Sequence, residues 1–431
     1  MGIDKQPLEL NNDFQYVLDA IEKQGKNLFI TGRAGTGKST LLQLFRNTTR
    51  KKTVVLAPTG IAALNVGGQT IHSFFGFPPR MISKLDIKKR RDRRLYKNME
   101  VLVIDEMSMV RADMLDNIDY FLRLNRDNPE PFGGVQVVFF GDLFQLPPVV
   151  ASDMEANLFQ SQYASPYFFS AQVLEELAIE MVELQKVYRQ ENRSFLKLLE
   201  AVRLNRMDYD LLRELNERYD PEFVPQEFYI TLSARNNRAD AINREELERI
   251  PLPAQTYVAT ITGNFKERLY PTDPALRLKL SAQVMFIKND PKRQFVNGTI
   301  GKVVKLEDDN VTVLVEEANA ERRYVEVERM DWEILRYKSS PTDPTQIETE
   351  VLGTFRQFPL RLAWAITIHK SQGKTFDKVI IDLGKGAFEH GQTYVALSRC
   401  RTLEGIVLKQ PIRPNDILTD ERIVEFYEQN F

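Results

Sequence analysis

The chain contains 431 residues, of which 43% are hydrophobic, and 58 Lys and Arg residues nearly balance 60 Asp and Glu residues, for a net charge of −2. A chain of this length can bury more than one core, so we expect two or three domains. The balanced charge excludes any argument for a nucleic-acid partner from overall composition. Such a partner must be argued from local sites.

Cysteine usage and the N-terminus bear on the compartment. The single cysteine, Cys400, excludes a disulfide framework within the chain and favours a reducing compartment. Residues 1–10 carry no targeting signal, and no apolar run reaches the length needed to span a membrane. We therefore expect a cytoplasmic protein, or a nuclear one if the source is eukaryotic, with no membrane partner.

The first predicted element is an amphipathic helix over residues 8–24. Phe14, Val17 and Ile21 fall on one side of it at helical spacing. Gln15 lies beside them and has two interpretations: its amide reads the edge of an adenine base, or it is a surface glutamine.

The stretch that organises the chain is a glycine loop between an apolar strand, residues 28–30, and a helix that begins near Lys38. The loop fits the pattern G-x-x-x-x-G-K-[ST], in which backbone N–H groups wrap a triphosphate, the lysine reaches the outer phosphates and the hydroxyl of Ser39 ligates Mg²⁺. The helix N-terminus adds the positive end of its dipole. We predict a nucleoside triphosphate site built from Gly32, Ala34, Gly35, Thr36, Gly37, Lys38, Ser39 and Thr40.

The next predicted strand, residues 53–57, leads into short polar side chains, a glycine turn and three phenylalanines before residue 78. Hydroxyls and amides can hold phosphates, and aromatic faces stack bases at about 1–3 kcal/mol each. This composition suits a single nucleic-acid strand. Burial of the phenylalanines in the core is the alternative, and we expect it for at least one of them.

A basic run over residues 88–94 has two interpretations. It is typical of a solvated, basic helix face. It is also compatible with a patch that contacts phosphates or duplex. The sequence leaves both open.

Two further strands end in polar side chains that suit triphosphate chemistry. Residues 101–104 lead to Asp105, expected to hold Mg²⁺ through water, and Glu106, expected to polarise the attacking water. Residues 135–140 lead to Gln145, which could sense the γ-phosphate from the end of a parallel strand or be a polar turn residue.

The pattern changes near residue 182. A second α/β lobe is predicted from there, with a strand–helix unit near residues 229–242. Residues 262–358 read as short strands separated by turns, which indicates a small β-barrel inserted into that lobe, and the α/β pattern resumes at residue 360. Arg189 is a candidate site residue only if the second lobe brings it to the triphosphate. We propose no proton transfer by His369.

The ordered motifs at residues 32–40, 57–76, 104–106, 141–148, 188–190, 369–375 and 394–401 resemble those of superfamily 1 helicases. More closely, they resemble the PIF-type (petite integration frequency) DNA helicases of the RecD-like branch of superfamily 1B. Residues 107–119 with 131–134 are similar to that family's own signature, and residues 296–298 fit its inserted barrel. The resemblance covers nearly the whole chain and implies a near-minimal core, as in bacterial members.

The resemblance implies an α/β fold of two RecA-like parallel-sheet lobes with a small SH3-like β-barrel in the second lobe. The implied boundaries place the first lobe at residues 1–180, with a wedge near 66–80. The second lobe follows at 181–261, the barrel at 262–358 and the rest of the second lobe at 359–431.

The resemblance also assigns roles to residues. Arg189 and Arg399 would stabilise charge on the γ-phosphoryl group of ATP beside Lys38, Asp105, Glu106 and Gln145, and Gly373 would touch the nucleotide. Ser39 and Asp105 would hold Mg²⁺. A DNA strand would meet, on the two lobes, Pro58, Thr59, Asn65, His72, Phe75, Thr367, His369 and Ser371.

The activity implied is an ATP-dependent DNA helicase that moves 5′-to-3′ on single-stranded DNA. Its implied substrates are forked DNA, G-quadruplexes and RNA–DNA hybrids in repair, recombination, replication and telomere-type maintenance, and we expect a monomer in solution. Three alternatives stay open. They are a translocase that does not separate strands, a RecD-like recombination subunit and a nucleotide-switched DNA-binding module.

Overall fold

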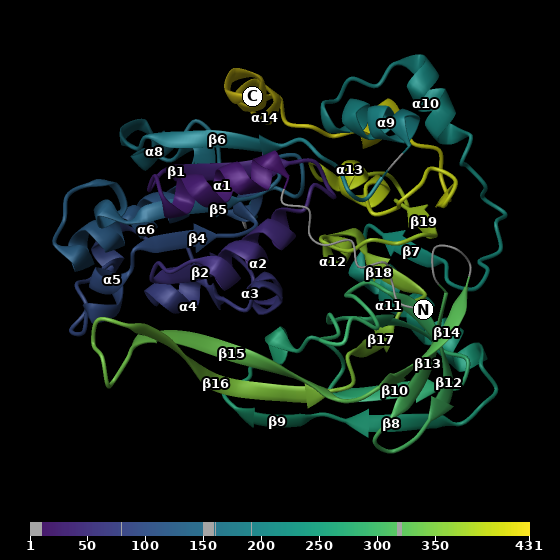
Figure 1. The fold of residues 1–431 in the computed structure, drawn as a ribbon. Helices are drawn as coiled ribbons and strands as arrows, with labels where there is room; N and C mark the ends of the chain where they lie inside the picture. Colours follow the sequence, from purple (N-terminus) through teal and green to yellow (C-terminus); the bar gives the residue numbers. More distant parts are fainter. Residues whose placement is uncertain (1–10, 79, 150–158, 160, 191, 317–320) are drawn as a thin grey trace.

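The predicted phosphate loop lies at the end of β1, inside a six-stranded sheet whose strands all run parallel (Figure 1). The computed structural model describes residues 11–431 except 79, 150–158, 160, 191 and 317–320. In order across the sheet, the strands are β3 (Gln69–Thr70), β2 (Thr53–Ala57), β4 (Val101–Ile104), β5 (Gln136–Phe140), β1 (Asn27–Gly32) and β6 (Ile179–Leu184). These elements define the first lobe.

Helices cover both faces of this sheet, because the inner strands are apolar on both sides. Along β1, Leu28 and Ile30 join one core with α1 and α2, while Phe29 joins the core on the opposite face, against α6. The first-lobe helices are α1 (Asn12–Glu22), α2 (Lys38–Thr48), α3 (Gly60–Val66), α4 (Ile71–Phe75), α5 (Arg94–Asn98), α6 (Ala112–Arg126) and α8 (Val173–Glu176). Short 3₁₀ turns add η1 (Lys84–Asp86), η2 (Met107–Met109), η3 (Pro131–Gly134) and η4 (Phe168–Ser170).

The second lobe contains a four-stranded parallel sheet. Its strands, in order, are β18 (Ala365–Thr367), β7 (Ile230–Ser233), β19 (Val379–Asp382) and β20 (Ile406–Leu408). Its helices are α9 (Arg193–Arg203), α10 (Tyr209–Asn216), α11 (Asn236–Arg249), α12 (Ile368–Ser371), α13 (Gln392–Leu397) and α14 (Glu421–Asn430), with η6 at Pro414–Asp416. The fold is therefore α/β with two RecA-like lobes, as predicted.

An antiparallel insert interrupts the second lobe between β7 and β18, as expected, and has a core of its own. One sheet consists of β14 (Arg322–Val327), β13 (Val311–Glu316), β12 (Ile300–Leu306), β11 (Gln283–Phe286) and β17 (Leu360–Leu362). The others pair β10 (Ala275–Lys279) with β8 (Ala254–Val258), and β15 (Met330–Ser339) with β16 (Ile347–Gln357) and β9 (Thr260–Gly263); η5 (Glu267–Leu269) lies between β9 and β10. The SH3-like description of this insert stays a prediction.

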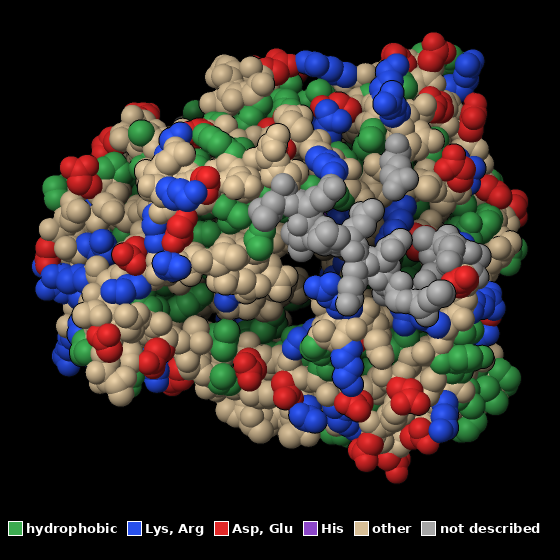
Figure 2. All heavy atoms as spheres, in the orientation of Figure 1, with side chains coloured by type: hydrophobic (Ala, Val, Ile, Leu, Met, Phe, Trp, Pro, Cys, Tyr) green, Lys and Arg blue, Asp and Glu red, His purple; other side chains and the backbone are tan. Residues whose placement is uncertain are grey.

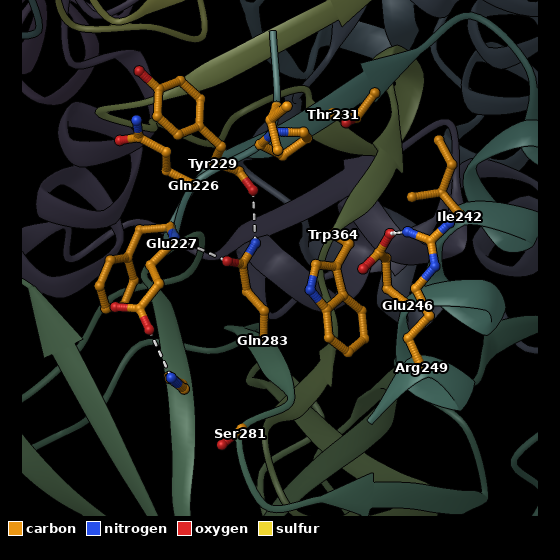
Figure 3. A pocket seen from close by; sticks show the side chains of 14 residues that line it. Gln226, Glu227, Tyr229, Thr231, Ile242, Glu246, Arg249, Ser281, Gln283 and Trp364 are labelled. Carbon is orange, nitrogen blue, oxygen red and sulfur yellow. Dashed lines mark hydrogen bonds and ion pairs between the residues drawn. The ribbon is translucent and has the colours of Figure 1, made fainter. Parts of the chain in front are cut away.

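Gln283 fixes the insert to the second lobe. Its amide donates to the carbonyl oxygens of Tyr229 at 2.7 Å and Ala363 at 2.8 Å, and its Oε1 accepts from the backbone N–H of Phe228 at 2.9 Å. Figure 3 shows Gln283 between Tyr229 and Trp364, at the wall of a cavity of about 360 Å³ at this junction.

Three predicted boundaries need correction. Residues 181–184, predicted to open the second lobe, belong to the first, because β6 pairs in parallel with β1 and places Val182 opposite Ile30. The insert begins at Ala254, before the predicted residue 262, because β8 pairs with β10 and β9 pairs with β16. The second lobe resumes at Ala365, since residues 360–362 pair antiparallel with β11 in the insert.

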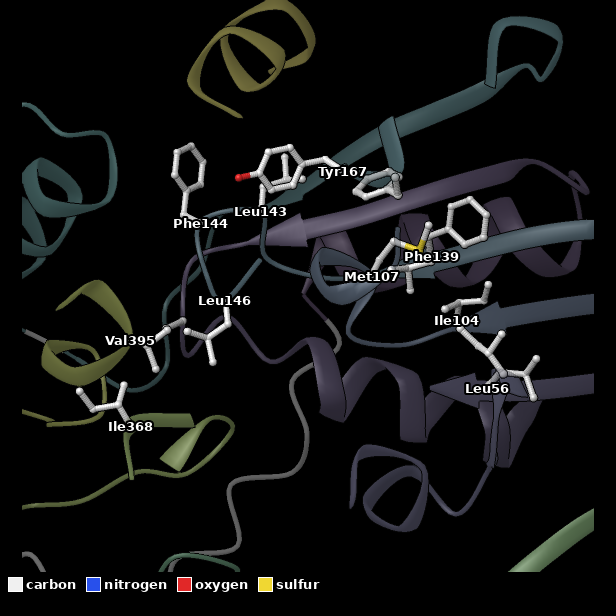
Figure 4. Close-up of a cluster of buried hydrophobic side chains, with 14 of the residues drawn as sticks. Leu56, Ile104, Met107, Phe139, Leu143, Phe144, Leu146, Tyr167, Ile368 and Val395 are labelled. Carbon is white, nitrogen blue, oxygen red and sulfur yellow. The ribbon is translucent and has the colours of Figure 1, made fainter. Parts of the chain in front are cut away.

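The two lobes share one hydrophobic core. Figure 4 shows Leu146, which follows β5, beside Val395 and Ile368 of the second lobe, whereas Leu143 lies beside Tyr167 of the first lobe. At the chain end, α14 packs back on the first lobe, and Tyr427 donates to Glu183 of β6 at 2.7 Å. No helix among the described residues is both long and apolar enough to cross a bilayer.

Candidate nucleotide site and DNA interface

The side chain of Lys38 is hydrogen-bonded to the backbone of the phosphate loop. The Lys38 ammonium donates to the carbonyl oxygens of Gly32 at 2.6 Å and Arg33 at 3.1 Å. Gly35 has a φ of +88°, and a Cβ there would lie 2.5 Å from Cβ of Arg189, so this approach requires glycine. Burial lowers the pKa of Lys38, opposed by the charges of Asp142 and Glu106. A half-buried ammonium group that is held by carbonyl oxygens is well placed to exchange them for phosphate oxygens.

Two carboxylates meet the lysine from the end of β4. Asp105 and Glu106 follow Ile104 directly, and Glu106 adopts a left-handed conformation with a φ of +52°. Burial raises the pKa of both carboxyl groups, and the charge of Asp105 raises that of Glu106 further. Raised values suit a group that must accept a proton near neutral pH.

A glutamine from the second lobe joins this cluster. Nε2 of Gln372 donates to Oε2 of Glu106 at 3.1 Å and to Oε1 of Gln145 at 2.9 Å. Gln145 in turn donates to Asp142 at 3.0 Å. Gln372 therefore bridges Glu106, the predicted proton acceptor, and Gln145, the predicted γ-phosphate sensor, although its own sequence context did not single it out. No spacing within the first lobe could have indicated it.

The two predicted arginines lie close together, as the resemblance implied. Arg189 donates to the carbonyl oxygen of Ser398 at 2.9 Å, and Arg399 donates to the hydroxyl of the same serine at 2.9 Å. Burial lowers the pKa of Arg189 to about 9 and also lowers that of Arg399. Tyr394, also missed from sequence, accepts from the backbone N–H of Ala34 in the phosphate loop at 3.0 Å.

A cavity of about 730 Å³ unites these groups. The predicted residues that line it are Ala34, Gly35, Gly37, Lys38, Ser39, Thr40, Asp105, Glu106, Gln145, Arg189, Gly373 and Arg399. Gly32 and Thr36 are buried behind the loop, where Thr36 donates to the carbonyl oxygen of Arg33 at 3.0 Å. Gln15 is exposed on α1 and is not among the residues that line the cavity. Its position agrees with the interpretation of Gln15 as a surface glutamine.

The donor set fits a nucleoside triphosphate with Mg²⁺. Three cations line the cavity and match an anionic polyphosphate: Lys38 and Arg189, which are half-buried, and Arg399, which is fully buried. Ser39 and Asp105 also line it, whereas no group of three His, Cys, Asp or Glu side chains gathers elsewhere in the described ranges. Such a small protein ligand set is typical of Mg²⁺, which keeps waters and substrate phosphates as its other ligands.

Two aromatic rings form another wall of the cavity. Phe14 of α1 and Tyr188 both line it, with their ring centroids 6.4 Å apart. Asn11 donates to the Tyr188 hydroxyl at 2.9 Å and so holds that ring near α1. Flat apolar faces beside a phosphate loop can pack against a base. The sequence offered Phe14 only as a residue on the buried side of a helix.

On the first lobe, the predicted DNA residues divide into two groups. Pro58, Thr59 and His72 are partly exposed and Asn65 is exposed, so their side chains can reach a ligand. Phe75 is fully buried, with its ring 5.3 Å from that of Phe77 and 5.1 Å from that of Phe121. The prediction that Phe75 contacts DNA is wrong for this structure, because its ring is already covered by core side chains.

On the second lobe, only one of the three predicted contacts is exposed. His369 is accessible and lies 2.8 Å from a carboxylate oxygen of Glu389. Thr367 is buried and caps α12 by accepting from the backbone N–H of Lys370, and Ser371 is buried and donates to the carbonyl oxygen of Ile368 at 2.6 Å. The predicted contacts by Thr367 and Ser371 are corrected accordingly, since these hydroxyls are used to hold α12.

The phosphate loop follows β1, and the two acids follow β4, which lies two strands away in the same parallel sheet. Two arginines line the same cavity between the lobes. Together these features define a P-loop NTPase with paired RecA-like lobes. A family model for PIF1-like helicases matches residues 9–210. The Bdellovibrio bacteriovorus protein named ATP-dependent DNA helicase Pif1 is 32% identical, over 98% of this chain and 92% of its own length. The chain belongs to the PIF1-like helicase family.

Longer relatives and solved structures agree with this assignment. The Xenopus laevis ATP-dependent DNA helicase PIF1 is 32% identical over 98% of this chain, and the chain spans 64% of that relative's length, less than two thirds. The crystal structure of Bacteroides sp Pif1 in complex with ADP-AlF4 matches with a TM-score of 0.90 at 39% identity, covering 98% of this chain and 97% of that one. Bacteroides Pif1 bound to ssDNA, also 39% identical, matches over the same shares with a TM-score of 0.69.

Proposed function

We propose that this chain is an ATP-dependent DNA helicase that moves 5′-to-3′ along single-stranded DNA and separates duplex ahead of it. The observation that carries the proposal is the cavity that Lys38, Glu106 and Gln145 of the first lobe line together with Arg399 of the second. Gln372 of the second lobe is hydrogen-bonded to Glu106 and Gln145. Because the chemistry needs groups from both lobes, hydrolysis is coupled to their relative position. A strand held across both lobes would then be moved when the lobes change position.

Each residue has a distinct task in this mechanism. The Lys38 ammonium binds the outer phosphates of ATP, and the Glu106 carboxylate takes a proton from the attacking water. Arg189 and Arg399 stabilise charge that develops on the γ-phosphoryl group, a contribution worth roughly 10³–10⁵ in rate in related NTPases. Ser39 and Asp105 would hold Mg²⁺, which neutralises phosphate charge when bound.

The finer assignments belong to the same proposal. We infer that the chain works on forked DNA, G-quadruplexes and RNA–DNA hybrids in repair, recombination, replication and telomere-type maintenance, as a monomer in the cytoplasm, or in the nucleus if the source is eukaryotic. Solved structures of related proteins support DNA partners: one is of Bacteroides Pif1 bound to ssDNA, and another concerns DNA unwinding at forked dsDNA by two coordinating Pif1 helicases. The second structure is also a reason to measure the oligomeric state of this chain on a fork.

The deciding experiment is strand separation on two partial duplexes, one with a 5′ tail and one with a 3′ tail. We expect unwinding of the 5′-tailed substrate only, and no unwinding by Lys38→Ala, because that variant lacks the cation for the outer phosphates. Preference for the 3′ tail would overturn the proposed direction. DNA-stimulated ATP hydrolysis without unwinding would replace the helicase with a translocase.

A further inference from the structure

The basic run at residues 88–97 gathers charge at the outer edge of the first lobe. This range contains seven Lys or Arg residues and only one acidic residue, Asp92, although the whole chain has a net charge of −2. Figure 2 shows blue side chains grouped at the left-hand edge of the molecule, where Figure 1 places α5. The predicted basic helix face is wrong for most of the run, because α5 begins only at Arg94.

Asp127 organises this charge into a cluster. The residue ends α6 in a left-handed conformation, with a φ of +54°. Its carboxylate pairs with Lys89, with Arg93 at 2.6 Å and with Lys97 at 3.0 Å. Three cations on one carboxylate lower the pKa of Asp127 and leave an excess of positive charge at one spot. An external anion would relieve the repulsion among them.

Two further cations stand beside this cluster. Lys88 and Arg91 are exposed, and neither has a carboxylate within ion-pair distance among the described residues. Their side chains therefore hold no part of the fold in place. They are free to meet a ligand.

The run is tied to the predicted wedge segment. Arg90 donates to the carbonyl oxygen of Phe75, and its guanidinium lies over the ring of Phe121 at 5.7 Å. Gly76 makes this crossing possible, because a Cβ there would lie 2.2 Å from Nη2 of Arg90. On the other side, Asn98 donates to the carbonyl oxygen of Pro344 at the tip of the β15–β16 hairpin. The basic surface thus lies between the wedge segment and that hairpin tip.

The surface offers cations but no stacking platform. Within residues 74–97, every aromatic side chain that the structure describes is buried: Phe74, Phe75, Phe77 and Tyr96. Sites for single strands combine cations with exposed aromatic rings on which bases stack. A duplex keeps its bases stacked inside and presents closely spaced phosphates, so it fits a surface of cations alone.

We propose that the surface formed by residues 88–97 and Asp127 binds the phosphate backbone of duplex DNA beside the point of strand separation. This proposal rests on the proposed function, because it names the part of a tailed DNA substrate that lies outside the groove between the lobes. The duplex would be gripped next to the wedge segment to which Arg90 is fixed.

The test compares binding of a 5′-tailed duplex and of the tail alone, without nucleotide, across a series of salt concentrations. In Lys88→Gln/Arg91→Gln, two phosphate contacts are lost, so the slope of log K against log salt should fall by about 1.8 and affinity for the tailed duplex by roughly tenfold or more. Affinity for the tail alone should not change. The matched control is Arg244→Gln/Lys292→Gln, which removes two exposed cations from the second lobe and the insert and should leave both affinities unchanged.

Two outcomes would overturn the proposal. One is unchanged affinity of the double variant for the tailed duplex. The other is an equal loss for the tail alone, which would assign the surface to the single-strand path. Failure of the proposed function would be distinguished by a different measurement. In that case single-stranded DNA would not stimulate ATP hydrolysis by the wild-type protein.

Discussion

Gln372 shows how a single side chain can link two lobes. Its amide donates to Glu106 and to Gln145, so one second-lobe residue holds both the expected proton acceptor and the expected γ-phosphate sensor. Both acceptors lie on loops that leave the ends of neighbouring strands, β4 and β5. These two hydrogen bonds can form only when the second lobe lies against the first, so they make the positions of Glu106 and Gln145 depend on the second lobe.

We therefore expect Gln372→Leu to lower kcat for ATP hydrolysis by roughly ten- to a hundredfold, since misplacing a catalytic group costs rate steeply. The KM for ATP should change little, because the lysine and the phosphate loop are untouched. Steady-state ATP hydrolysis with saturating single-stranded DNA measures both constants. Gln429→Leu, an exposed glutamine on α14, is the control. An unchanged kcat would show that the bridge has no part in catalysis.

Glu106 provides a prediction on pH. Burial raises the pKa of this carboxyl in the folded protein above its ordinary value of 4.5, so the folded state binds the proton more tightly than the unfolded state. Stability contributed by the protonated form is therefore lost as pH rises above that ordinary value. Glu106→Gln cannot ionise, so without nucleotide or metal its thermal midpoint should exceed that of wild type at about pH 8, and the difference should shrink towards about pH 5.

The same variant should lose ATP hydrolysis, because an amide cannot accept the proton. A midpoint difference that grows as pH falls would contradict the assigned direction of the shift. Asp105→Asn is an informative companion, since removing its charge should lower the pKa of Glu106 and weaken the pH dependence.

At the scale of elements, α14 is the clearest case of a segment whose place the chain order does not reveal. It follows the last strand of the second lobe, yet it packs on the first. Phe426 stacks on Phe169 of the first lobe with centroids 4.4 Å apart, and the Tyr427 hydroxyl donates to Glu183 of β6. The Tyr427 ring also lies 4.6 Å from the guanidinium of the buried Arg203, at the end of α9. Phe144, one residue before Gln145, covers the same guanidinium at 4.3 Å. The chain end thus supports the loop that carries the γ-phosphate sensor.

We expect Tyr427→Ala to destabilise the protein by about 2 kcal/mol, because it removes a half-buried ring from Arg203 and Phe144. Tyr427→Phe keeps the ring and loses the contacts of the hydroxyl with Glu183 and Arg203, which should cost about 1 kcal/mol. Denaturant unfolding followed by fluorescence measures both. Equal losses in the two variants would mean that the ring contributes nothing beyond its hydroxyl.

At the scale of the whole molecule, the β15–β16 hairpin connects the insert to the first lobe. The backbone N–H of Tyr337 donates to Gln69 at 3.1 Å, and its hydroxyl accepts from the backbone N–H of Val55 at 3.1 Å. Its ring also meets Phe74 edge-on at 6.0 Å. These contacts join the insert to strands β2 and β3 of the first lobe. Each of the three parts of the protein, the two lobes and the insert, therefore contacts the other two.

We predict that Tyr337→Ala lets the insert separate from the first lobe in the absence of DNA. Dyes on cysteines introduced at Leu85 and Tyr324, both exposed, would report the change as lower energy transfer. The native Cys400 is buried, which favours selective labelling of the introduced positions. Unchanged transfer in Tyr337→Ala would show that other contacts hold the insert in place.

Local pattern was sufficient for much of the candidate site. The glycine loop before α2, the acids after β4 and Gln145 after β5 could be predicted because each lies where a strand ends, and parallel strands bring those ends to one edge. The alternation of apolar residues likewise indicated two α/β lobes and an antiparallel insert between them. The role expected of Arg189 and Arg399 came from the family resemblance, since spacing alone left both arginines without one.

Only the tertiary structure decided which polar and aromatic residues are accessible and which segments meet across the lobes. Phe75, Thr367 and Ser371 resembled DNA contacts, but core packing and helix capping already use them. Strand β6 could not be assigned from its own residues, because its place depends on pairing with β1, whose residues lie 152 positions earlier in the chain (Asn27 pairs with Ile179). The sequence by itself determined the nucleotide chemistry, which a short contiguous loop encodes. Burial, edge pairing and the bridge made by Gln372 depend on neighbours distant in the chain, so they could be known only from the folded molecule.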